Sequence, residues 1–82
     1  MKILDKINNY INEYDYKIII TNKFINIVNY KEIIDFDSKK ISIRNNLGIT
    51  IIEGKDLVIS KMLEDEILIT GIFCSINLKG DT

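Results

Sequence analysis

Cys74 is the strongest potential nucleophile in this sequence, but its surroundings argue against catalysis. A catalytic thiolate needs a neighbouring base or an electropositive environment. Cys74 stands instead between Phe73 and Ser75 in an apolar run, and the chain contains no histidine. We therefore predict a buried structural cysteine. One cysteine without histidine also cannot supply the usual ligands of a zinc site.

Acidic residues occur in two short clusters that could in principle bind calcium or transfer protons. Asp35 and Asp37 lie two residues apart and could share a strand face. The polar residues 38–40 that follow them favour an ordinary solvated turn. The run Glu64–Glu66 favours a polar corner between apolar segments. Neither cluster is predicted to be a metal or acid–base site.

A small basic patch and a pair of glycines are the remaining candidates for a binding site. Lys39, Lys40 and Arg44 are too few charges to specify nucleic acid. Gly48 and Gly54 flank an apolar stretch that lacks the strand–loop–helix context of a phosphate-binding loop. We predict no catalytic, metal-binding or cofactor-binding residue, no nucleic-acid partner and no small-molecule substrate. The protein is not expected to be an enzyme.

Length and composition indicate one small folded domain. The chain has 82 residues, a formal charge of −1 and 46% hydrophobic residues, which is too apolar for a disordered chain. Twenty residues are isoleucine and none is alanine, which favours strands over helices. The charged N-terminus lacks the apolar run of a signal peptide, and no segment has the roughly 20 apolar residues of a membrane span. We expect a soluble cytoplasmic protein.

Residues 1–15 form a first unit, which we predict to be an amphipathic helix or arm. Apolar residues recur there at spacings of three and four, as on one face of a helix. These residues are Ile3, Leu4, Ile7, Tyr10, Ile11 and Tyr14. A helix of this length is marginal by itself and needs a surface to pack against. That surface could be its own domain, a partner or a membrane.

Residues 16–82 form a second, all-β unit, because their apolar residues alternate with a period of two. Strands are expected at 17–21, 24–30, 32–36, 40–44, 49–53 and 57–60, with one long or two short strands at 67–78. A turn is predicted at 54–56. A bulge at Gly71 is expected to bring Ile67 and Ile69 onto one side with the alternate residues of 72–78.

Strand spacing predicts a mainly β fold. The strands recur every 8–12 residues without an intervening helix, which favours an antiparallel meander of about six to eight strands curled into a roll or sandwich. Residues 18–20 and 49–52 are apolar on both strand faces, so the N-terminal helix or a second copy must cover one face. A homo-oligomer is therefore expected. The possible interaction surface is Ile3, Ile7, Ile11, Tyr14, Ile18 and Ile20.

The order of turns and apolar residues over 17–78 resembles a known family. The most specific part is Gly54, Leu57 and Ile59, then a short acidic corner, and then Glu66–Ile72. This pattern resembles the YabP/YqfC family of sporulation proteins, and of its two branches it is most similar to YqfC. The resemblance implies a small protein of the mother cell that is needed for normal spore development. The resemblance also implies that the protein acts together with a membrane protein such as YqfD. It assigns no catalytic residue to this chain.

Two functions follow from these observations. The first is a non-enzymatic sporulation protein that acts as an interaction or assembly module in the mother cell, cytoplasmic or peripheral to the membrane around the forespore. The alternative is a small β-roll that binds an apolar ligand inside its curled sheet. Interiors of small barrels are usually filled by their own side chains, which favours the first.

Overall fold

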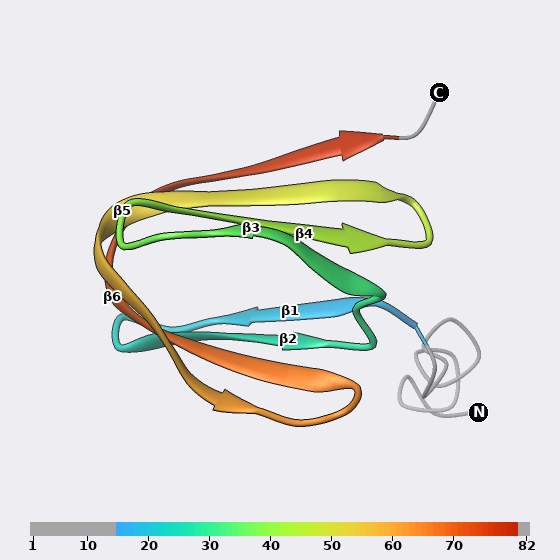
Figure 1. Ribbon diagram of the computed structural model, residues 1–82, viewed down its shortest axis with the longest axis horizontal. Coiled ribbons are helices and arrows are strands. Elements are labelled where there is room, and N and C mark those ends of the chain that lie inside the picture. Colours follow the sequence, from blue (N-terminus) through green and yellow to red (C-terminus); the bar gives the residue numbers. More distant parts are fainter. Residues whose placement is uncertain (1–14, 81–82) are drawn as a thin grey trace, which may run out of the picture.

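The computed structural model describes residues 15–80, which form a single antiparallel β-sheet (Figure 1). Its strands are β1 (Lys17–Ile20), β2 (Phe24–Val28), β3 (Glu32–Phe36), β4 (Lys40–Asn45), β5 (Gly48–Met62) and β6 (Glu66–Gly80). The predicted mainly β, antiparallel fold is confirmed, but it is not a simple meander, because β2 pairs with β6 and not with β3. The N-terminal helix or arm was predicted over residues 1–15, of which 1–14 lie outside the described residues.

Two long strands, β5 and β6, belong to both halves of the molecule. The strand order is β1-β2-β6-β5-β4-β3. β5 and β6 bend together, so the sheet folds back on itself into an upper and a lower half (Figure 1). The upper half contains β3, β4, the start of β5 and the end of β6, and the lower half contains β1, β2, the start of β6 and the end of β5. β1 and β3 are the outermost strands and do not pair, so the curled sheet is open.

Isoleucine fills the space between the two halves. The fully or almost fully buried aliphatic side chains are Ile25, Ile27, Ile67 and Ile69 from the lower half, Ile41, Ile43 and Ile52 from the upper half, and Leu57 near the bend. The buried isoleucines of β2, β4 and β6 lie two residues apart in each strand, so both members of each pair face inward. Burying each side chain contributes about 1.5–3 kcal/mol. The period-two pattern of residues 40–44 predicts that Ile41 and Ile43 face the core and that Ser42 and Arg44 face water. Ile41 and Ile43 are fully buried as predicted, but Ser42 is also buried, at 6% exposed.

The bend depends on backbone conformations that few residues adopt. Asp56 has φ +52° and Gly71, which lies across from it, has φ +134°. Between the pairs Lys55–Ile72 and Val58–Thr70, β5 has two residues where β6 has one. This bulge forces the local kink. The turn between β3 and β4 is tied to the bend, because the Leu57 N–H donates to the Ser38 carbonyl oxygen at 2.9 Å.

One predicted turn is wrong. Residues 54–56 were expected to separate two strands, but they lie inside β5, where Gly54 still opposes Phe73. Glycine and aspartate serve a sharp bend within a strand as well as a chain reversal, so residue type alone does not separate the two.

The register of β6 also differs from the expectation. The extra residue opposite Gly71 lies in β5, and the bulged residue of β6 is Cys74, between the pairs formed by Ser75 and Phe73. As a result Phe73 packs against the core, whereas Ile72 is 59% exposed. The β5–β6 ladder has three register shifts, at Cys74, at Gly71 and at Ser60. The expected alignment is met in part: Ile76 and Leu78 lie on the inner face with Ile67 and Ile69, whereas Ile72 and Cys74 are exposed.

Replacing Gly71 with alanine should destabilise the fold by about 1–3 kcal/mol. The positive φ disfavours any side chain, and an added Cβ would lie 2.6 Å from the Asp56 carbonyl oxygen. Urea denaturation measures the loss. Gly80→Ala is the matched control, because an added Cβ there meets no atom within 4 Å. Equal stability of the two variants would contradict this explanation of the bend.

Candidate functional site

A small pocket lies at the open end of the curled sheet, away from the bend. It forms where β1 begins, where β4 turns into β5 and where β6 ends. Its volume is about 150 Å³. The lining residues are Tyr16, Asn45, Leu47, Gly48, Ile49, Thr50, Leu78, Lys79 and Gly80. Ordinary ligand pockets hold about 300–1,000 Å³, so this one suits a single apolar group rather than a metabolite.

Three of the lining residues, Tyr16, Asn45 and Thr50, are joined by hydrogen bonds. The Tyr16 hydroxyl donates to the Thr50 Oγ1 at 2.7 Å, although the two residues are 34 positions apart. The Asn45 side-chain amide lies 3.5 Å from the same oxygen, and its own Oδ1 accepts from the Leu47 N–H at 2.6 Å. Thr50 is fully buried, so its hydroxyl depends on these partners. The network ties the start of β1 in the lower half to β5 in the upper half.

Burial dominates the electrostatics of Tyr16. Burial raises the pKa of its hydroxyl above the ordinary value, and hydrogen bonding to Thr50 and Asn45 partly offsets that rise. The neutral hydroxyl is therefore the form that the folded protein stabilises. No buried side-chain nitrogen or oxygen among the described residues lacks a hydrogen-bond partner. The network is thus a satisfied structural contact, and no reactive group is left over within it.

The candidate chemical residues do not form an active site. Cys74 was predicted to be buried, and this is wrong: it is a free, exposed cysteine. Cys74 is the bulged residue of β6, so no β5 residue stands opposite it. On the other side of β6, β2 pairs only with Glu66–Thr70, so no described strand lies next to Cys74. These two features explain the exposure. Among residues 15–80 no group of three or more histidine, cysteine, aspartate or glutamate side chains could hold a metal ion.

The acidic and basic candidates stabilise turns and strand pairs. The Asp37 Oδ1 accepts from the backbone N–H groups of Lys39 and Lys40 at 2.7 and 2.9 Å, which caps the turn between β3 and β4. Arg44 is paired with Glu32 at 2.9 Å across β3 and β4. The Asp37 contacts fit the predicted solvated turn. Arg44, one of the three basic residues of the small patch, is therefore paired with a carboxylate.

The predicted interaction residues separate into two groups. Ile3, Ile7, Ile11 and Tyr14 lie outside the described residues. Ile18 is half-buried and packs against the core, whereas Ile20 is 58% exposed at the edge strand β1.

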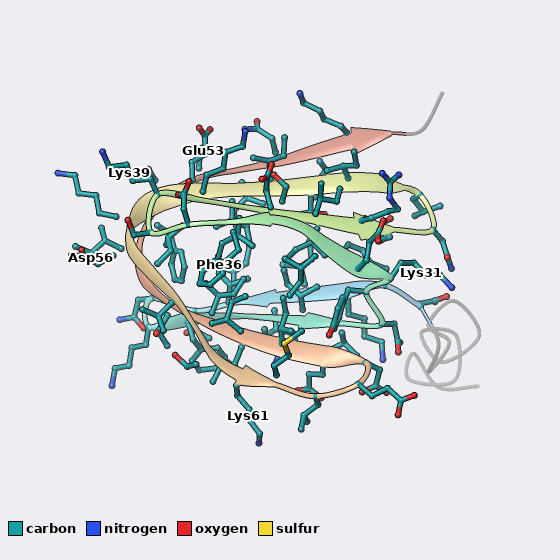
Figure 2. All side chains as sticks on the ribbon, viewed as in Figure 1. Lys31, Phe36, Lys39, Glu53, Asp56 and Lys61 are labelled. Carbon is teal, nitrogen blue, oxygen red and sulfur yellow. The ribbon has the colours of Figure 1, made fainter. Side chains whose placement is uncertain are left out.

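The sequence reasoning missed an apolar patch on the outer surface of the lower half. We call this patch the outer apolar face, and its residues are Ile19, Phe24, Val58 and Leu68. Ile19 and Val58 are 50% and 51% exposed, and the other two are partly buried. Lys61 opposes Leu68 in the strand register and projects outward at the rim (Figure 2). Only the register across four strands brings these residues together, so spacing along the chain could not reveal them.

These features define a small, open, all-β domain whose described part contains no metal-ion cluster and no helix able to cross a bilayer. A comparison with protein families matches residues 12–82 to the YabP family. The chain therefore belongs to the YabP family, which is associated with sporulation. Comparisons with curated proteins and with solved structures give no match.

Replacing Tyr16 with phenylalanine should cost about 1 kcal/mol of folding stability, because it removes the hydrogen bond to the buried Thr50 hydroxyl. It should also change the alkaline pH dependence. The raised pKa of Tyr16 means that its contribution is complete below the unfolded pKa of about 10 and is lost as pH rises through the folded pKa. The Tyr16→Phe variant has no hydroxyl to ionise, so its stability should fall less as the pH rises through this range.

Denaturant titrations between neutral pH and about pH 11 measure both effects. Tyr30→Phe is the control, because the Tyr30 hydroxyl donates to the Leu63 carbonyl oxygen in an exposed hydrogen bond. Because Tyr16 is intact in this control, its folding stability should still fall at alkaline pH as in the unmodified protein. Identical pH profiles for the Tyr16 variant and the unmodified protein would contradict the role of this network.

Proposed function

We propose that this protein is a non-enzymatic interaction and assembly module that acts in the mother cell during endospore formation. Membership of the sporulation-associated YabP family supports the process. The number of exposed apolar side chains supports the interaction role and is the observation that carries it. Ten large apolar residues are exposed among residues 15–80: Ile19, Ile20, Ile34, Phe36, Leu47, Val58, Met62, Leu63, Ile72 and Leu78.

Two of these ten residues lie on one surface of the lower half. Ile19 and Val58 belong to the outer apolar face, where side chains of four strands, β1, β2, β5 and β6, surround Asn26 and Thr70. Asn26 donates to Glu66 at 2.9 Å and the Thr70 hydroxyl lies 2.6 Å from that of Ser60, so the polar groups here are already paired. A partner could therefore bury this surface without leaving these polar groups unpaired.

The resemblance to the YabP/YqfC family suggests the partner. A sporulation membrane protein such as YqfD would hold this cytoplasmic module at the membrane around the forespore. Ile3, Ile7, Ile11 and Tyr14 remain candidate contacts together with Ile18 and Ile20, and the docking role of residues 1–15 stays a prediction.

Ligand binding is the weaker alternative. The space between the halves is occupied by the protein's own aliphatic side chains, eight of which are 0–2% exposed. The pocket of about 150 Å³ is small for a ligand and opens at the end of the sheet. An apolar ligand would have to displace packed isoleucines to reach the interior, which would sacrifice the burial that stabilises the fold.

Substituting lysine at both Ile19 and Val58 should abolish recruitment to the forespore membrane without unfolding the protein. Both side chains are half exposed, so the fold tolerates the change, whereas an apolar contact with a partner does not. Fluorescence microscopy of tagged protein in sporulating cells of the organism that encodes it measures localisation.

Leu47→Lys is the matched control for this experiment. Leu47 is 73% exposed but lies in the turn between β4 and β5, away from the outer apolar face. It should localise as the unmodified protein does. If the double variant concentrates at the membrane as strongly as the control, the outer apolar face is not the docking surface.

A further inference from the structure

The end of β6 has an unpaired edge. From Ile72 to Gly80 the strand pairs with β5 on one side, whereas β2 pairs with β6 only from Glu66 to Thr70. No other strand among residues 15–80 pairs with this edge, which forms the outer border of the upper half in Figure 1. In an antiparallel ladder every second residue directs its N–H and C=O groups away from its partner. A row of such groups is a template for another strand.

The other three free edges carry features that discourage pairing. β1 is only four residues long. β3 has a register shift at Ile34, and an ion pair joins Glu32 to Arg44 beside it. The end of β5 has a register shift at Ser60 and carries Lys61. Short strands, bulges and charges are the means by which natural sheets protect their edges.

Residues 75–80 at the end of β6 carry fewer of those features, because the bulge at Cys74 precedes them. Residues 75–80 pair with β5 in one uninterrupted register, and Lys79 is the only charged residue among them. Leu78 opposes the buried Thr50 and therefore lies on the inner face of the sheet, but it is 70% exposed. Ile76 lies on the same face and is only partly buried. This edge thus combines free backbone groups with an uncovered apolar surface.

We propose that a second copy of this chain pairs antiparallel with this edge, about a two-fold axis at Asn77. This inference rests on the proposed assembly role and gives it a surface and a partner. Asn77 is the midpoint of the regular segment 75–79, and pairing there places Ile76 opposite Leu78 of the second copy. Ser75 then lies opposite Lys79, and the two Asn77 side chains face each other on the outer surface.

A second copy suits this edge because the edge is complementary to itself. Apolar residues meet apolar residues on the inner face, and polar residues meet polar residues on the outer face. The net charge of −1 gives little repulsion between copies. A two-fold interface uses the same edge on both copies, so it closes at a dimer.

The size of the edge predicts the strength of the dimer. Five paired residues, 75–79, at about 3.4 Å each and a sheet about 10 Å deep give a strip of roughly 170 Å² per copy. Stable interfaces bury about 800 Å² per copy, so the dimer should form and dissociate with concentration. Leu78 is the most exposed large apolar side chain of this edge, so its burial contributes most of the apolar area that dimerisation removes from water.

Light scattering of the purified full chain over a concentration series tests the pairing. The unmodified protein should approach twice the monomer mass as concentration rises. Leu78→Lys should raise the dissociation constant at least about tenfold, because it places a charge opposite Ile76 of the second copy. Leu47→Lys is the matched control, because Leu47 is similarly exposed at 73% but is not on an edge. It should dimerise normally.

The single native cysteine gives a second, independent measurement. A nitroxide on exposed Cys74 should report a separation of about 20 Å between the two Cys74 Cα positions, because six residues of antiparallel strand lie between them. A strict monomer at all concentrations, as expected if residues 1–14 of the same chain cover the edge, contradicts the proposal. A dimer that Leu78→Lys leaves intact, or whose Cys74 separation is much longer, also contradicts it.

The experiments distinguish failure of edge pairing from failure of the proposed function. A protein that stays monomeric but still concentrates at the forespore membrane contradicts edge pairing and supports the interaction role. A protein that dimerises with the expected Cys74 separation but stays diffuse in sporulating cells supports edge pairing and contradicts recruitment.

Discussion

The shared bend of β5 and β6 is the constraint on which the rest of the fold depends. Asp56 and Gly71 adopt positive φ values across from each other, and the extra β5 residue at this point turns both strands together. Without the bend, the isoleucines of the two halves would lie on one extended sheet and remain in water. The bend thus places the isoleucines of the two halves face to face in an apolar interior, and the Tyr16–Thr50 hydrogen bond joins the halves at the opposite end.

The same bend determines what remains exposed. Because β5 and β6 each serve both halves, each loses a neighbouring strand partway along its length. Among residues 15–80 the sheet therefore has four unpaired edges instead of the two expected for a simple sheet. The lower half also keeps Ile19 and Val58 on its outer surface. These exposed apolar side chains and unpaired edges follow from the geometry of this small sheet.

Local pattern predicted much of this fold, and long-range register explains the rest. The alternation of Ile41 and Ile43 identified their strand and its buried face correctly, because period two is a local property. The turn expected at 54–56 was wrong because a bend inside a strand uses the same residue types. Exposure of Cys74 could not be predicted, because it depends on a bulge and on a missing neighbour. The contact between Tyr16 and Thr50 spans 34 positions, beyond the reach of any local pattern.

Native-state hydrogen exchange tests most directly whether the bent β5–β6 pair makes the two halves one cooperative unit. The informative amides belong to fully buried residues, Ile52 in the upper half and Ile69 in the lower half. Both should exchange only through global unfolding, with the same free energy of opening and the same dependence on denaturant. Clearly different opening free energies for Ile52 and Ile69 would show that the halves unfold separately and would contradict the account.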